Sequence, residues 1–174
     1  MPKTSSLRLT DQRRRLPVSA VECLFLILLL FFSTLSIEGM AGQDSAMKSY
    51  VRKYRNLAEK KSAQYSIPAN VILAVAIVES GSGKTRVAKE LHNHFGLVGN
   101  NHLKRKSRYK AYPTVEASYD HFCRHLAKKK FYRRLSKSTD NRAWITAISR
   151  SGYSERPKVW EQRILRVLKD IKRL

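Results

Sequence analysis

Acidic residues and cysteines are scarce in this chain, and these shortages narrow the possible partners and exclude cysteine-based sites. The 174 residues include 13 Asp and Glu against 35 Lys and Arg, which gives a formal net charge of +22 at pH 7. Such an excess implies an anionic partner, such as nucleic acid, anionic lipid or an acidic envelope polymer, and composition does not choose among them. The two cysteines are Cys23 and Cys123. Because Cys23 lies in an N-terminal apolar stretch, the rest of the chain can form no internal disulfide and no cysteine-based zinc site.

Internal repeats and low-complexity linkers are also absent, and the length suits one domain with a substantial core. Residues 1–17 are basic, residues 18–37 are mostly apolar, and Gly39-Met40-Ala41 resembles a cleavage site, a layout typical of an export signal. Since 18–37 is just long enough to span a membrane, residues 1–41 are predicted to be a signal peptide or a signal anchor. Residues 42–174 are then exported and keep 30 Lys and Arg against 10 Asp and Glu. Export argues against a nucleic-acid partner.

An apolar run between Pro68 and Glu79 dominates the exported part. Its length and the proline at its start favour a helix buried on nearly all sides, which Gly81 and Gly83 are expected to end. Glu79 is then a carboxyl at the C-terminal end of a buried helix. The helix dipole and the apolar neighbours both raise its pKa, which suits a general acid near neutral pH. The plain alternative is a glutamate that ends a helix and points at water.

The remaining pattern is mostly helical, so the predicted fold class is mainly α. Ser66 is expected to cap the buried helix. Residues 97–113 are expected to hold at most a small β element, with a hairpin near Leu103 to Tyr112. Further helices are predicted over 46–65, 85–91 and 115–127, after a cap at Asp140 or Asn141, and from Pro157 onwards.

Two short patterns look like ligand sites, and we reject both. Gly81–Thr85 resembles the end of a phosphate-binding loop, but Val78 stands where that motif needs its first glycine, and no βαβ unit is predicted. His92 and His94 flank Asn93, and alternate residues rarely aim at one metal from a helix. We therefore expect no metal site and no cofactor.

Four short segments stand in the order and spacing of the motifs of a known family. They read ESGSGKT after the apolar run, then NHFGL, YKAYPTVEAS and GYSERP, and with their flanks they cover about residues 46–174. Together they resemble the glucosaminidase family of peptidoglycan hydrolases, glycoside hydrolase family 73, which includes flagellar peptidoglycan hydrolases. The resemblance implies a lysozyme-like helical domain over 42–174 with a short β-hairpin lobe. It also implies an enzyme of the bacterial cell envelope that hydrolyses the β-1,4 bond between N-acetylglucosamine and N-acetylmuramic acid.

The resemblance also implies roles for six residues. Glu79 matches the general acid, and Tyr153 matches a tyrosine of the sugar-binding cleft, so both are predicted to be catalytic. For Tyr153 the alternative is a core tyrosine that closes a helix end. Four further residues are predicted to bind substrate or shape the cleft: Ser80, Phe95, Gly96 and Tyr112.

The chain departs from the family over residues 91–115, which contain no Asp or Glu where a second carboxylate is often carried on a β lobe. Three explanations stay open: the substrate's own 2-acetamido group acts as nucleophile, a tyrosine holds the attacking water, or turnover is slow and the protein mainly binds the wall. A lytic transglycosylase with a single acid is a further alternative. The expected partners are peptidoglycan strands, with anionic envelope polymers or the membrane surface at the basic face, and the protein is expected to be a monomer.

Overall fold

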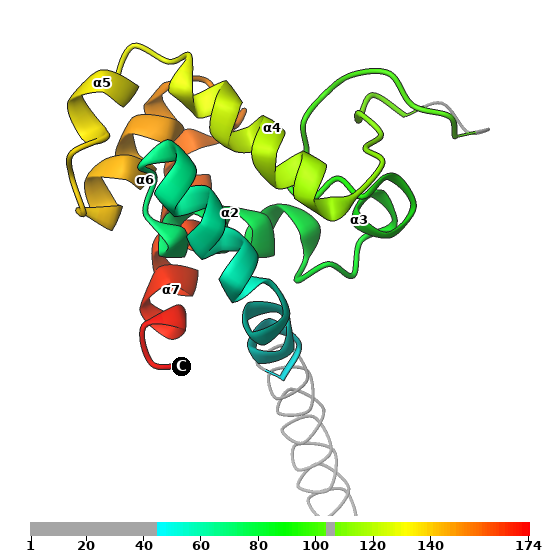
Figure 1. Cartoon of the computed structure of the whole chain (residues 1–174), viewed down its shortest axis with the longest axis horizontal. Coiled ribbons are helices and arrows are strands. Elements are labelled where there is room, and N and C mark those ends of the chain that lie inside the picture. Colours follow the sequence, from blue (N-terminus) through cyan, green and yellow to red (C-terminus); the bar gives the residue numbers. More distant parts are fainter. Residues whose placement is uncertain (1–44, 104–106) are drawn as a thin grey trace, which may run out of the picture. The chain divides into compact units, whose positions relative to one another are not determined.

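The protein is described by a computed structural model that covers residues 45–103 and 107–174 (Figure 1). The predicted signal peptide or anchor over 1–41 lies outside these ranges. Within them, no helix is both long and apolar enough to cross a membrane. The mainly helical fold class is confirmed. Residues 45–65 are helical, and the labelled helices are α2 (Ala69–Ser80), α3 (Arg86–Leu91), α4 (Val115–Ala127), α5 (Tyr132–Leu135), α6 (Asn141–Arg150) and α7 (Pro157–Ile171).

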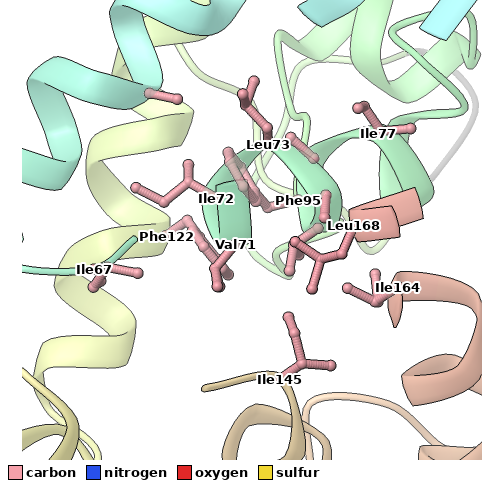
Figure 2. Packing of buried hydrophobic residues seen from close by; sticks show 14 of the residues in the cluster. Ile67, Val71, Ile72, Leu73, Ile77, Phe95, Phe122, Ile145, Ile164 and Leu168 are labelled. Atoms are coloured by element: carbon pink, nitrogen blue, oxygen red, sulfur yellow. The ribbon is translucent and has the colours of Figure 1, made fainter. Parts of the chain in front are cut away.

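Helix α2 is the centre of the core. Its residues Val71–Ile77 are all buried, so the helix has no solvent face over two turns. It packs against α6 and α7, and Figure 2 shows Ile145 and Ile164 from those helices beside it, with Phe122 of α4 nearby. Burying each large apolar side chain contributes about 1.5–3 kcal/mol. Because other helices surround α2, its sequence is apolar without the usual helical period.

Short-range features mark the starts of four helices, and the predicted cap at Asp140 and the predicted start at Pro157 are confirmed. The Thr85 hydroxyl accepts the Ala88 N–H at the start of α3, and Thr114 does the same for Ala117 at α4. Asp140 accepts two backbone N–H groups at α6, and Pro157 occupies the first turn of α7. These short-range bonds satisfy donors that the helices leave unpaired, which fixes where each helix begins.

The predicted cap of α2 is wrong. The residue that precedes the helix is Pro68, with ψ at 131° and no side-chain cap bond. Ser66 instead lies in the preceding turn with φ at 50°. Two residues separate Ser66 from Ala69, whereas a capping side chain must come from the residue directly before the helix.

The predicted β-hairpin lobe is not present as paired strands in the described parts of the chain. Among residues 97–103 and 107–111, one isolated antiparallel bridge joins Val98 and Tyr109. Side-chain amides bind carbonyls on both sides of this bridge. Asn101 donates to the carbonyls of Ser107 and Tyr109, and Asn93 donates to those of Leu97 and Lys110. The segment is therefore an irregular loop held by asparagines, and it forms one wall of the site described next.

Candidate active site

A cleft of about 840 Å³ opens beside the C-terminal end of α2. It brings together four of the six predicted site residues, which come from α2, from the loop after α3 and from the loop before α7. These four are Glu79, Phe95, Gly96 and Tyr153. The other walls come from Tyr109 in the asparagine-held loop, His121 and His125 on α4, and Trp160 and Arg163 on α7.

Glu79 lies partly buried at this cleft. The indole Nε1 of Trp160 donates a hydrogen bond of 2.6 Å to its Oε1. Burial raises the pKa of the Glu79 carboxyl, while the Trp160 hydrogen bond and the charge of Arg163 lower it part of the way back. The net upward shift keeps the carboxyl protonated to a higher pH than an exposed glutamate, as an acid catalyst requires.

The second oxygen of Glu79 faces the backbone of Gly96. A Cβ added to Gly96 would lie 3.1 Å from Glu79 Oε2, and φ at this residue is +63°. Both the close approach and the left-handed conformation require glycine here. The Phe95-Gly96 pair thus forms the floor against which the carboxyl is held.

Tyr153 joins two walls of the cleft. Its hydroxyl donates a 2.7 Å hydrogen bond to the carbonyl of Phe95, and its ring lies 5.4 Å from that of Trp160. Burial, with the nearby charge of Glu79 as a second cause, raises the pKa of the Tyr153 hydroxyl well above its usual range. Tyr153 is therefore neutral and can orient a water or a sugar hydroxyl as an acceptor, but it cannot act as a base near neutral pH.

Ser80 and Tyr112 do not line the cleft, which differs from the predicted substrate contacts. The Ser80 side chain is fully buried, since its hydroxyl donates to the Ala76 carbonyl and accepts the Gly83 N–H. Tyr112 is 7% exposed, and its hydroxyl is hydrogen-bonded to Nδ1 of His121 at 2.6 Å. Ser80 therefore holds the turn that follows Glu79, and Tyr112 holds a histidine of the cleft wall.

The Gly81–Thr85 turn packs on a buried aromatic cluster. A Cβ at Gly83 would lie 3.2 Å from the Tyr50 ring. The Tyr50 hydroxyl bonds to Nδ1 of His94 and, at 2.9 Å, to the hydroxyl of Tyr119. Burial lowers the pKa of His94 to about 4, so His94 is a neutral hydrogen-bonding partner near neutral pH. The turn that resembled a phosphate loop is thus anchored to the core and directs the chain away from Glu79.

Sequence reasoning missed Trp160 as a site residue and assigned it only to the apolar face of the last helix. One signal was present, because a buried tryptophan N–H needs a hydrogen-bond acceptor. That signal does not identify the acceptor, because Glu79 lies 81 positions before Trp160 and no local pattern connects them.

A mainly helical domain, an open cleft and a partly buried carboxyl with a raised pKa are together the features of an acid-dependent glycosidase. The sequence model of the glucosaminidase family, described as mannosyl-glycoprotein endo-beta-N-acetylglucosaminidase, matches residues 55–173, and the chain belongs to this family. The protein is therefore a glycosidase. The resemblance that the four sequence segments predicted is confirmed.

Solved structures show the same fold at low sequence identity. The glycoside hydrolase domain of Salmonella typhimurium FlgJ has a TM-score of 0.60 at 18% identity, covering 73% of this chain and 89% of that one. A peptidoglycan hydrolase mutant from Sphingomonas sp. A1 has 0.59 at 19% identity, covering 72% and 99%. A chain of a type VI secretion system effector–immunity complex from Pseudomonas protegens has 0.55 at 21% identity, covering 73% and 94%. No curated protein sequence gives a significant match.

Proposed function

We propose that this protein is an exported peptidoglycan hydrolase that cleaves the β-1,4 bond between N-acetylglucosamine and N-acetylmuramic acid, with Glu79 as general acid. The observation that carries the proposal is the position and pKa of the Glu79 carboxyl. Glu79 lines an open cleft, and burial raises the pKa of its carboxyl. In the reaction the protonated carboxyl gives its proton to the glycosidic oxygen as the bond to the sugar carbon breaks. The family description and the two hydrolases of the same fold support the substrate class.

The charge of the cleft suits an anionic glycan. Four cationic residues line it: Arg108, Lys129, Arg156 and Arg163. Peptidoglycan strands carry carboxylates on the stem peptides, or on the lactyl group where the stem is absent, so the cations would attract the strand toward Glu79. The signal peptide or signal anchor predicted over 1–41 supports a location in the bacterial cell envelope, where this polymer is found.

Product analysis tests the proposal. Purified peptidoglycan digested with the protein should yield new reducing ends on N-acetylglucosamine, identified by mass spectrometry after borohydride reduction. Anhydro-muramic ends would identify a lytic transglycosylase instead, and reducing ends on N-acetylmuramic acid would assign the other glycosidic bond. An intact polymer would favour a non-catalytic wall-binding module.

A second groove, of about 380 Å³, supports the proposal that the basic face holds anionic polymer. It shares Lys129 with the cleft, and three more cations line it: Lys130, Arg134 and Arg150. No acidic residue lines it. Since charge attraction between exposed groups is screened over about 10 Å at 0.1 M salt and 3 Å at 1 M, binding there should depend strongly on salt.

We therefore expect the protein with Glu79→Gln to sediment with intact peptidoglycan at low salt and to be released at high salt. Adding Lys130→Ser and Arg134→Ser should weaken this binding several-fold. The matched control, Arg52→Ser with Lys89→Ser, removes the same charge at exposed positions outside both grooves. Equal losses in the two double variants would assign the binding to overall charge rather than to the groove.

A further inference from the structure

The cleft contains a carboxylate that the sequence motifs did not assign. Two acidic residues line it, Glu79 and Glu155. Glu155 lies in the loop between Tyr153 and Pro157. The cleft thus holds a second carboxylate, although residues 91–115 contain none.

An ion pair joins Glu155 to Arg108, and both residues line the cleft. Arg108 Nη1 lies 3.6 Å from Glu155 Oε1, and the two side chains are 66% and 86% exposed. Arg108 also lies over the ring of Tyr109, and a Cβ added to Gly96 would lie 3.9 Å from that ring and 3.1 Å from Glu79 Oε2. Arg108, Tyr109 and Gly96 therefore line the same cleft as the two carboxyls. Because an exposed ion pair contributes only about 0–1 kcal/mol, Glu155 can leave Arg108 when substrate enters.

The two carboxyls stand in contrasting surroundings. Glu79 is partly buried, with a raised pKa. Glu155 is open to solvent, with its side chain 86% exposed. A partly buried carboxyl and a solvent-exposed carboxyl in the same cleft is the kind of contrast by which glycosidases divide acid and base work.

Resting on the proposed function, we propose that Glu155 is the catalytic base of this enzyme. Glu79 gives its proton to the leaving glycosidic oxygen as the bond from that oxygen to the anomeric carbon breaks. Glu155 takes a proton from a water whose oxygen bonds to the same carbon from the opposite face. The products are a free hydroxyl on one sugar and a reducing end of inverted configuration on the other, and proton exchange with solvent restores both carboxyls.

Three variants separate this role from a structural one. Glu155→Gln keeps the size of the side chain, and its kcat should fall by about 10²–10⁴-fold, the range for loss of a positioned base. Arg108→Gln breaks the ion pair but leaves the carboxylate, so it should lose much less activity. Glu90→Gln removes an exposed carboxylate that pairs with Arg86 on α3, outside the cleft, and should match the wild type. Equal losses of activity in Glu155→Gln and Arg108→Gln would show that the ion pair has only a structural role and would overturn the proposal.

Chemical rescue gives a readout that a structural role would not move. Azide should restore activity to Glu155→Ala by attacking the anomeric carbon without a base, and the product should be a glycosyl azide of inverted configuration. It should not restore Glu79→Gln, in which the leaving oxygen still lacks its proton.

The outcomes distinguish this inference from the function on which it rests. A wild-type protein that cleaves no glycan rejects the proposed function itself. A wild type that cleaves, together with an equally active Glu155→Gln, overturns only the role of Glu155. Retained configuration with strong inhibition by a thiazoline mimic would also overturn it, in favour of attack by the substrate's 2-acetamido group.

Discussion

Glu79→Gln is expected to lower kcat on purified peptidoglycan by about 10²–10⁴-fold, the range for loss of a positioned general acid. Glutamine has the same shape, and its side-chain oxygen can still accept the hydrogen bond from Trp160 Nε1. The fold should therefore persist while the proton for the leaving oxygen is lost. The release of reducing ends measures the rate, and circular dichroism checks the fold.

The control for this variant is Glu161→Gln on α7, the helix that carries Trp160. Glu161 accepts a 2.6 Å hydrogen bond from the Thr146 hydroxyl and does not line the cleft. Glu161→Gln makes the same substitution next to Trp160, and activity should stay within about twofold of the wild type, since the side chain does not line the cleft. Wild-type activity in Glu79→Gln would reject Glu79 as the acid.

The pH dependence of kcat also tests the assignment of Glu79 as the general acid. An acid works only while protonated, so kcat should fall as pH rises through the raised pKa of Glu79. The hydrogen bond from Trp160 stabilises the charged carboxylate and lowers this pKa. Trp160→Phe removes that bond, the pKa rises further, and the alkaline limb of the profile should move to higher pH. A shift to lower pH would contradict the assignment of that limb to Glu79.

Gly96→Ala is expected to lower kcat by about tenfold to a hundredfold in a protein that still folds. The new Cβ would lie 3.1 Å from Glu79 Oε2, so the carboxyl or the loop must move. A displacement of about 1 Å in a catalytic group can cost about 10²-fold in rate. The left-handed backbone at φ +63° adds about 1–2 kcal/mol of strain. Steady-state kinetics and thermal unfolding measure the two effects separately.

Gly81→Ala is the matched control for that strain. Its φ is +57°, and the added Cβ would make an ordinary 3.4 Å contact with Thr85 rather than approach the carboxyl. Both variants should therefore lose similar stability, while only Gly96→Ala should lose most of its activity. Equal losses of activity would assign the effect of Gly96→Ala to general destabilisation.

The sequence by itself determined where several helices begin, and it singled out Glu79 as the candidate acid. The unbroken apolar run of α2 required burial on all sides, and the threonine, aspartate and proline at the starts of α3, α4, α6 and α7 fixed where those helices begin. These features depend on neighbours within a few positions, where side-chain reach and helix geometry leave little choice. Glu79 could be singled out for the same reason, since its own helix supplies the apolar surroundings.

Only the tertiary structure decided which residues lie around Glu79 in the cleft. Trp160, 81 positions later, supplies the hydrogen bond, Gly96 supplies the floor, and Glu155 comes to the same cleft from the loop before α7. Ser80 follows Glu79 directly, yet it turns into the core, because successive helical residues point in different directions. The partners of a site are set by how the helices pack around α2, and that packing sums many weak contacts that no local pattern records.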